Sequence, residues 1–165
     1  MKKKKYISIF LCAFAAFWLL LIFIFSAQGK NLSNSISYGV SDLIVRIVRP
    51  DFDSLVDGEQ AYQLWRINVV LRKLAHFFLY TVLGMLLRFV VSRIKWPDLP
   101  QLGTALLLGL TLAALDEVHQ YFVPGRSALA RDVVIDFAGI LLGCFIFWLF
   151  RYLRQRRRDI SAAEL

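Results

Sequence analysis

The sequence is poor in the residues and motifs that mark several common classes of functional site. It contains only two cysteines, and they do not form a CxxC pair. Cys12 and Cys144 lie in apolar surroundings and are therefore interpreted as small hydrophobic residues without a redox role. The sequence also lacks a glycine-rich phosphate loop, a GxSxG nucleophile motif and an HExxH metal motif. Nothing in it therefore indicates a P-loop nucleotide site, a serine-hydrolase site or a metalloprotease site.

Charged residues are also scarce across four long hydrophobic segments. Hydrophobic residues make up 58% of the 165 residues, and they are concentrated at positions 7–25, 69–91, 102–122 and 133–150. A helix that crosses a hydrocarbon core of about 30 Å needs about 20 mostly apolar residues, so each segment is long enough. The sequence predicts one all-α domain over residues 1–165, a four-transmembrane-helix bundle in the cell membrane. Segment 7–25 exceeds the roughly 7–15 apolar residues of a signal peptide, so we expect a retained anchor.

The distribution of charge predicts the orientation of this bundle. With both termini in the cytoplasm, the inner segments hold twelve of the 20 Lys and Arg residues but only three of the 12 acidic residues. The inner side then carries a net charge of +9 and the outer side −1, the asymmetry of the positive-inside rule. The basic tail, residues 151–165, suits contact with anionic lipid headgroups and needs no nucleic acid as a partner. We therefore expect membrane lipids as partners, and both termini inside.

The longest connection, residues 26–68, is predicted to lie on the outer side. An apolar stripe of Ile36, Val40, Leu43, Ile44 and Ile47 has helical spacing over residues 37–48, which is typical of a short interfacial helix that lies on the outer leaflet or caps the bundle. Pro50 is expected to end it. From Glu59 the pattern is helical again and can run without a break into the second span.

Polar and ionisable residues gather at one depth, near the outer ends of the predicted spans. Charged groups inside a membrane cost roughly 2.5–3.5 kcal/mol each, so they usually face one another or a water-filled cavity. Helical spacing places Lys73, His76 and Tyr80 on one face, and it does the same for Asp116, His119 and Gln120 and for Asp132 and Asp136. The complete set comprises Ser26 and Gln28 on the first span, Arg72, Lys73, His76 and Tyr80 on the second, Asp116, Glu117, His119 and Gln120 on the third, Arg126 in the following loop, and Arg131, Asp132 and Asp136 on the fourth.

Each of these residues also has a purely structural explanation. Arg72 and Lys73 are long enough to reach lipid headgroups. His76 can serve as an interhelical hydrogen-bonding group, and Asp136 can form a structural ion pair with an arginine such as Arg126. Taken together, however, two histidines, four carboxylates and four bases at one depth exceed what four helices need for association. We therefore favour a functional pocket.

The residue types in this pocket indicate two kinds of chemistry. A carboxylate can orient an imidazole for general acid–base catalysis, which makes the candidate catalytic residues His76, Asp116, Glu117, His119 and Asp136. Basic side chains can hold a phosphate, pyrophosphate or carboxylate, and the candidate ligand-binding residues are Arg72, Lys73, Tyr80, Gln120, Arg126, Arg131, Asp132, Ser26 and Gln28. No metal or other cofactor is predicted, because no metal motif is present. The side chains of metal-ligating type are His76, His119, Asp116, Glu117, Asp132 and Asp136.

Several spaced motifs resemble the VanZ-like family of membrane proteins. The resemblance rests on residues 72–84, which begin Arg-Lys-Leu-Ala-His, and on residues 116–126, which read Asp-Glu-Val-His-Gln-Tyr-Phe-Val-Pro-Gly-Arg. It continues in residues 131–143, which begin Arg-Asp-Val-Val-Ile-Asp, and in the Phe-Ser-x-Gln element at residues 25–28. The resemblance implies a link to glycopeptide (teicoplanin-type) antibiotic resistance in bacteria. It supplies no catalytic residues, because the molecular activity of that family is poorly defined.

The sequence therefore favours a membrane protein that acts on or binds an anionic envelope component at the outer face. The expected ligand class is a lipid or a lipid-linked cell-wall intermediate, and a glycopeptide is a further candidate partner. One alternative is a non-catalytic factor that binds a lipid, an antibiotic or a partner protein. A small transporter is disfavoured, because the inner half of the bundle has no matching polar path. Neither enzymatic activity nor the oligomeric state follows from the sequence.

Overall fold

The computed structural model describes residues 2–28, 30–124, 126 and 129–163, and within these it contains helices and no strand. The all-α prediction is therefore confirmed for the part of the chain that is described. The α-helices are α1 (Lys2–Ala27), α2 (Lys30–Val48), α3 (Asp57–Val91), α4 (Asp98–Tyr121) and α5 (Ala130–Ala163), and a short 3-10 turn, η1 (Phe52–Ser54), precedes α3.

Four of these helices, α1, α3, α4 and α5, are long and apolar enough to cross a membrane, as predicted. The prediction that the helix before the second span continues into it is also confirmed, because α3 is unbroken over 35 residues. At 1.5 Å per residue α3 is roughly 52 Å long, well beyond a hydrocarbon core of about 30 Å. Its first turns therefore extend past the membrane.

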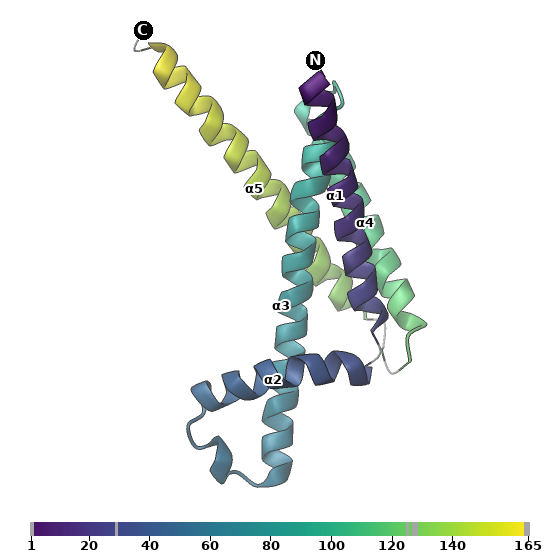
Figure 1. The fold of residues 1–165 in the computed structure, drawn as a ribbon, viewed down its shortest axis with the longest axis vertical. Coiled ribbons are helices and arrows are strands. Elements are labelled where there is room, and N and C mark those ends of the chain that lie inside the picture. Colours follow the sequence, from purple (N-terminus) through teal and green to yellow (C-terminus); the bar gives the residue numbers. More distant parts are fainter. Residues whose placement is uncertain (1, 29, 125, 127–128, 164–165) are drawn as a thin grey trace.

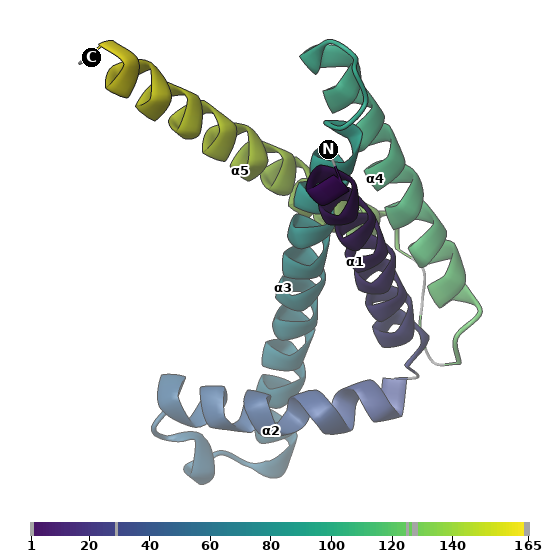
Figure 2. The same cartoon turned by 45° about the horizontal axis from the view of Figure 1, so that its top comes forward.

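The helices form a bundle with both chain termini at the same end (Figure 1). The loop between α3 and α4 also lies at this end, which we call the terminal end. At the opposite end, which we call the loop end, α1 passes to α2 and α4 passes to α5. Helix α2 runs crosswise to the spans and passes over α3 in both views (Figures 1 and 2). The predicted interfacial helix therefore exists and is longer than expected.

Local sequence accounts for where these helices begin and end. Val56 is extended, and α3 then begins with Asp57 and Glu59 in its first turn, where acidic groups favour the positive end of the helix dipole. Asp98 and Asp132 have the same place in α4 and α5. Helix α2 ends at Val48, two residues before Pro50. Ser41 and Val45 of α2 are buried, whereas Val40, Leu43 and Ile47 of the predicted apolar stripe are exposed and free to contact lipid. Ile44 is half-buried, and the side chain of Ile36 lies outside the part that the structure describes.

Glycines set the spacing of the two most closely packed spans, α3 and α5. A Cβ atom at Gly139 of α5 would lie 2.5 Å from the carbonyl oxygen of Phe77, and one at Gly84 of α3 would lie 2.5 Å from the carbonyl oxygen of Ile140. Small residues allow helix backbones in membranes to approach closely. The core beside this seam consists of apolar side chains, with Leu83 and Ile140 fully buried.

A second polar cluster lies at the terminal end, far from the predicted pocket along the spans. Arg88 of α3 is 2% exposed, pairs with Asp98 and donates a hydrogen bond to Gln101 Oε1 at 2.8 Å. Asp98 also accepts a hydrogen bond from Arg151 of α5 at 3.1 Å. This cluster links α3, α4 and α5 at the terminal end.

Candidate functional site

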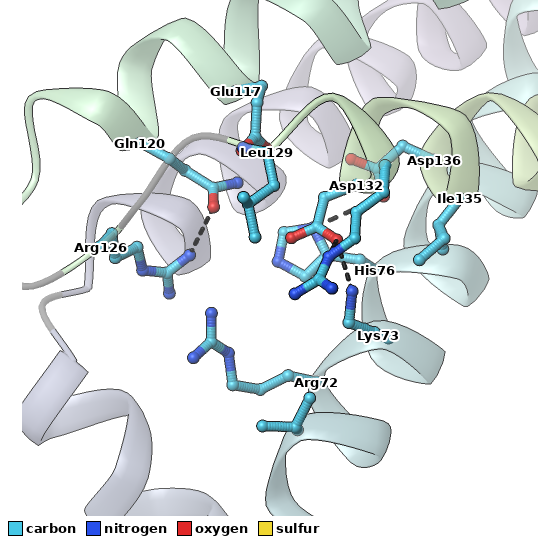
Figure 3. A pocket seen from close by; sticks show the side chains of 12 residues that line it. Arg72, Lys73, His76, Glu117, Gln120, Arg126, Leu129, Asp132, Ile135 and Asp136 are labelled. Atoms are coloured by element: carbon cyan, nitrogen blue, oxygen red, sulfur yellow. Dashed lines mark hydrogen bonds and ion pairs between the residues drawn. The ribbon is translucent and has the colours of Figure 1, made fainter.

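The largest group of polar side chains converges at the loop end, around a pocket with a volume of about 180 Å³ (Figure 3). Three elements build it: the middle of α3, the last turns of α4 with the loop after it, and the first turns of α5. Its lining residues are Val69, Arg72, Lys73, His76, Glu117, Gln120, Arg126, Leu129, Arg131, Asp132, Ile135 and Asp136.

Two guanidinium groups in this pocket lack a carboxylate partner among the residues that the structure describes. Arg126 donates hydrogen bonds to Gln120 Oε1 at 3.0 Å, to the carbonyl of Gln28 at 3.0 Å and to that of Phe25 at 3.2 Å, all of them neutral oxygens. Desolvation lowers the pKa of Arg126, and repulsion from Arg72 lowers it further. An arginine nevertheless remains charged at neutral pH.

Arg72 extends from α3 toward the centre of the pocket, on the side of Arg126 (Figure 3). It forms no ion pair and no hydrogen bond within the described part of the chain. Neither arginine is therefore held in an ion pair by the described residues, and both guanidinium groups are available to an anion in the pocket.

The other bases of the pocket are already paired. Lys73 Nζ lies 2.5 Å from Asp132 Oδ1, and both side chains are about one-third exposed. Arg131 Nε lies 3.8 Å from the same oxygen and is 68% exposed. Asp132 thus pairs with both basic neighbours and links α3 to the first turn of α5.

Three ionisable side chains form the inner wall of the site. His76 Nδ1 lies 3.8 Å from Asp136 Oδ1, which is too long for a hydrogen bond, and its ring stacks on Tyr80. Asp116 is fully buried behind them, and its Oδ2 accepts a hydrogen bond from Ser26 Oγ at 2.7 Å. Gln120 Nε2 donates a second hydrogen bond to the same oxygen at 3.1 Å. One ligand atom from each of His76, Asp116 and Asp136 lies within 4.8 Å of the other two.

Glu117 joins the end of α4 to the start of α5. Its Oε1 accepts a hydrogen bond from the backbone N–H of Leu129 at 2.5 Å. Its other oxygen, Oε2, is buried and makes no hydrogen bond with the residues that the structure describes. The carboxylate is therefore well placed to hold the connection that carries Arg126.

Most of the residues predicted from sequence lie together at this site. Nine of them line the pocket: Arg72, Lys73, His76, Glu117, Gln120, Arg126, Arg131, Asp132 and Asp136. Asp116, Ser26 and Tyr80 lie immediately behind this lining, in contact with it.

Two predicted residues are placed differently. His119 does not line the pocket, and its ring packs edge-on against Phe23 of α1, with ring centroids 5.7 Å apart. Gln28 takes part through its backbone carbonyl and Arg126, whereas its side chain does not line the pocket.

Sequence reasoning missed the apolar part of the lining. Val69, Leu129 and Ile135 contribute to the wall, and Leu129 also supplies the backbone N–H that Glu117 accepts. Val69 precedes Lys73 by one helical turn, and Ile135 is adjacent to Asp136, so their positions only weakly indicated that they line the pocket. Because most residues of the spans are apolar, the residue type does not distinguish a pocket-lining residue from one that faces lipid.

The site offers two kinds of chemistry. Its arginine-rich mouth can bind an anion, and its inner wall can carry out acid–base or metal-ligand chemistry.

Comparison with known proteins identifies the family to which the chain belongs. No curated protein and no solved structure was found to be similar to the chain. The model of the VanZ/LLP1 family matches residues 11–151, which include most of each of the four spans and every residue of the pocket. The chain is therefore a multi-pass membrane protein that belongs to the VanZ/LLP1 family.

Proposed function

We propose that this protein binds the phosphate or pyrophosphate headgroup of an anionic envelope lipid, or of a lipid-linked cell-wall intermediate, in the pocket at the loop end. The observation that carries the proposal is the pair of guanidinium groups, Arg72 and Arg126, which face the pocket without a carboxylate partner among the described residues. Arginine matches the geometry of phosphate oxygens, and its hydrogen bonds to an anion are stronger than neutral ones.

The position of the pocket favours a lipid as the source of this phosphate. It lies at one end of the membrane-spanning bundle, between spans whose outer surfaces are apolar and exposed. A headgroup can therefore occupy the pocket while its acyl or prenyl chain stays in the bilayer. By the charge distribution this end is the outer one, so the ligand would come from the outer leaflet.

Two other functions receive less support. Transport through the bundle would need a polar path from the pocket to the terminal end, but the described core between them is packed with apolar residues such as Leu83, Ala113 and Ile140. A role in glycopeptide resistance rests on family membership alone. In this proposal it would follow from binding a lipid-linked cell-wall intermediate, and His76 and Asp136 beside the anion would suit acid–base chemistry on it.

Lipid binding by purified protein in detergent tests the proposal. We expect a short-chain phosphatidic acid to bind and phosphatidylcholine, which carries no net charge, to bind at least tenfold more weakly. Arg72→Gln should weaken phosphatidic acid binding by tenfold or more, since a hydrogen bond to a charged group is worth about 1.5–3 kcal/mol. Inorganic pyrophosphate is the soluble probe, and stronger binding of it than of the lipid would indicate a free anion as ligand.

The matched control is Arg66→Gln, the same substitution on the same helix. Arg66 is exposed, lies outside the pocket and stacks on Tyr62, so its removal should leave lipid affinity unchanged. Equal binding of the two lipids, or full affinity in Arg72→Gln, would contradict the proposal.

A further inference from the structure

The inner wall of the pocket brings together three side chains of metal-ligating type from three different helices. His76 belongs to α3, Asp116 to α4 and Asp136 to α5, and one ligand atom of each lies within 4.8 Å of the other two. Asp116 is 0% exposed and Asp136 is 2% exposed. The linear sequence separates them widely, which is why no spacing motif reveals this cluster.

The hydrogen bonds of Asp116 are a second, independent indication of a ligand. Ser26 Oγ and Gln120 Nε2 both donate to Oδ2 and thereby fix the orientation of the carboxylate. Its other oxygen, Oδ1, is buried and meets no donor in hydrogen-bond geometry among the described residues, and the nearby Tyr80 hydroxyl, also buried, is likewise without a partner in that geometry. A carboxylate with one oxygen held by neighbouring donors and the other left free is the arrangement that supports metal ligands in proteins.

Charge gives the same indication. The bases around the pocket bond elsewhere, with Lys73 on Asp132 and Arg126 on neutral oxygens. Neither Asp116 nor Asp136 forms an ion pair with a lysine or arginine in the described part of the chain, and Asp136 Oδ1 lies 3.8 Å from His76 Nδ1. Burying two carboxylates without a cationic partner is costly, and one divalent cation would balance their charge.

We propose that His76, Asp116 and Asp136 bind a divalent transition-metal ion of the zinc or manganese class. One imidazole nitrogen with carboxylate oxygens suits these ions, whereas magnesium prefers an all-oxygen set. Protein nitrogen and oxygen atoms lie about 2.0–2.2 Å from zinc, so the three side chains would move inward from their present separations of up to 4.8 Å when an ion binds. Three protein ligands leave a coordination position open, as in catalytic zinc sites.

His76 and Asp136 also line the pocket, so the ion would border the anion site between Arg72 and Arg126. A phosphate oxygen could then occupy the open position. This last step rests on the proposed function, whereas metal binding by the three residues does not depend on it.

Metal titration of the purified protein tests the site. Full-length protein is treated with a chelator, exchanged into metal-free buffer and titrated with Zn²⁺ or Mn²⁺ by calorimetry, followed by elemental analysis. We expect about one equivalent to bind, and the thermal midpoint to rise, because a ligand that binds only the folded state stabilises it. His76→Gln and Asp136→Asn should each lower the affinity at least tenfold, in keeping with the loss of one ligand.

Two control variants remove the same residue types, a histidine and an aspartate, at positions outside the cluster. His119→Gln removes the other histidine, which packs against Phe23, and Asp42→Asn removes a carboxylate of α2 that pairs with Arg46 far from the cluster in the chain. Both should bind metal as the unaltered protein does. Equal affinity in the cluster variants and the controls, tighter binding of Mg²⁺ than of Zn²⁺, or no binding at all would overturn the proposal. If no metal binds, a proton in place of a metal ion offsets the negative charge of Asp116 and Asp136.

A measurement on the unaltered protein covers the case in which the variants fail to fold. X-ray absorption of the zinc-loaded protein should show nitrogen and oxygen ligands with the signature of one imidazole, and a spectrum without imidazole would overturn the site. Failure of the lipid proposal gives a different pattern. In that case Arg72→Gln leaves lipid binding unchanged while the metal still binds at the inner wall.

Discussion

At the scale of single residues, the site depends on which neighbours share a helical face. Asp116 and Gln120 are four residues apart on α4 and share a hydrogen bond, as their spacing predicts. His119 is only three residues from Asp116, and this small rotation turns its ring toward Phe23 of α1. Spacing on one helix therefore predicted the members of the polar stripe, but it could not resolve the packing of α1 against α4, which decides the place of His119.

Ser26 is the single side chain of α1 that donates a hydrogen bond to the cluster. We expect Ser26→Ala to lower the stability by about 1–2 kcal/mol, because a buried carboxylate oxygen loses one of its two donors. Thermal unfolding in detergent measures this effect. Thr111→Ala is the control, since Thr111 is exposed and its hydroxyl donates only to Leu107 of its own helix. An equal loss in both variants would show that the contact with Asp116 contributes nothing.

At the scale of elements, the number and order of the helices followed from the sequence, and their lengths followed in part. The helical pattern from Glu59 predicted nearly all of α3, which begins two residues earlier, at Asp57. The fourth span was predicted to end at residue 150, whereas α5 continues to Ala163. Hydropathy detects the part of a helix that lies in lipid. Hydrogen bonding within the helix can continue in water, where Arg154 and its charged neighbours gain solvation, so polar extensions carry no hydropathy signal.

The glycine seam between α3 and α5 offers a sharp test of the packing of the spans. Gly139→Ala places a methyl group against the Phe77 carbonyl and should force the helices apart, with a loss of about 1–3 kcal/mol typical of overpacking. Gly103→Ala is the matched control, because a Cβ atom there meets nothing within 4 Å. In that open position the change should be neutral or stabilise the helix by up to about 1 kcal/mol. Thermal midpoints of the two variants should therefore shift in opposite directions or differ clearly. Similar midpoints would refute the role of the seam.

At the scale of the whole molecule, the structure places both termini at one end of the bundle and the pocket at the other. The fold does not itself state which end faces the cytoplasm. That orientation rests on the excess of lysine and arginine in the terminal segments.

Cysteine labelling in intact cells tests the orientation. In a Cys12→Ser, Cys144→Ala background, Asp53→Cys should react with an impermeant maleimide from outside. Arg158→Cys should react only after the cells are permeabilised. Both positions are exposed in the structure, so accessibility alone does not distinguish them. Labelling of Arg158→Cys in intact cells would invert the bundle and place the pocket inside.

The distribution of the site over four helices has a consequence for its biogenesis. Ser26 and Asp116 are 90 residues apart in the chain, and Asp136 is synthesised later still. At a translation rate of about 5–20 residues per second, several seconds or more separate the first of these groups from the last. Late in that interval His76 and Asp116 have been synthesised, whereas the helix that closes the pocket has not. The pocket is therefore completed only when α5 inserts. A chain arrested before that point contains most of the polar residues of the site but lacks the wall that α5 supplies.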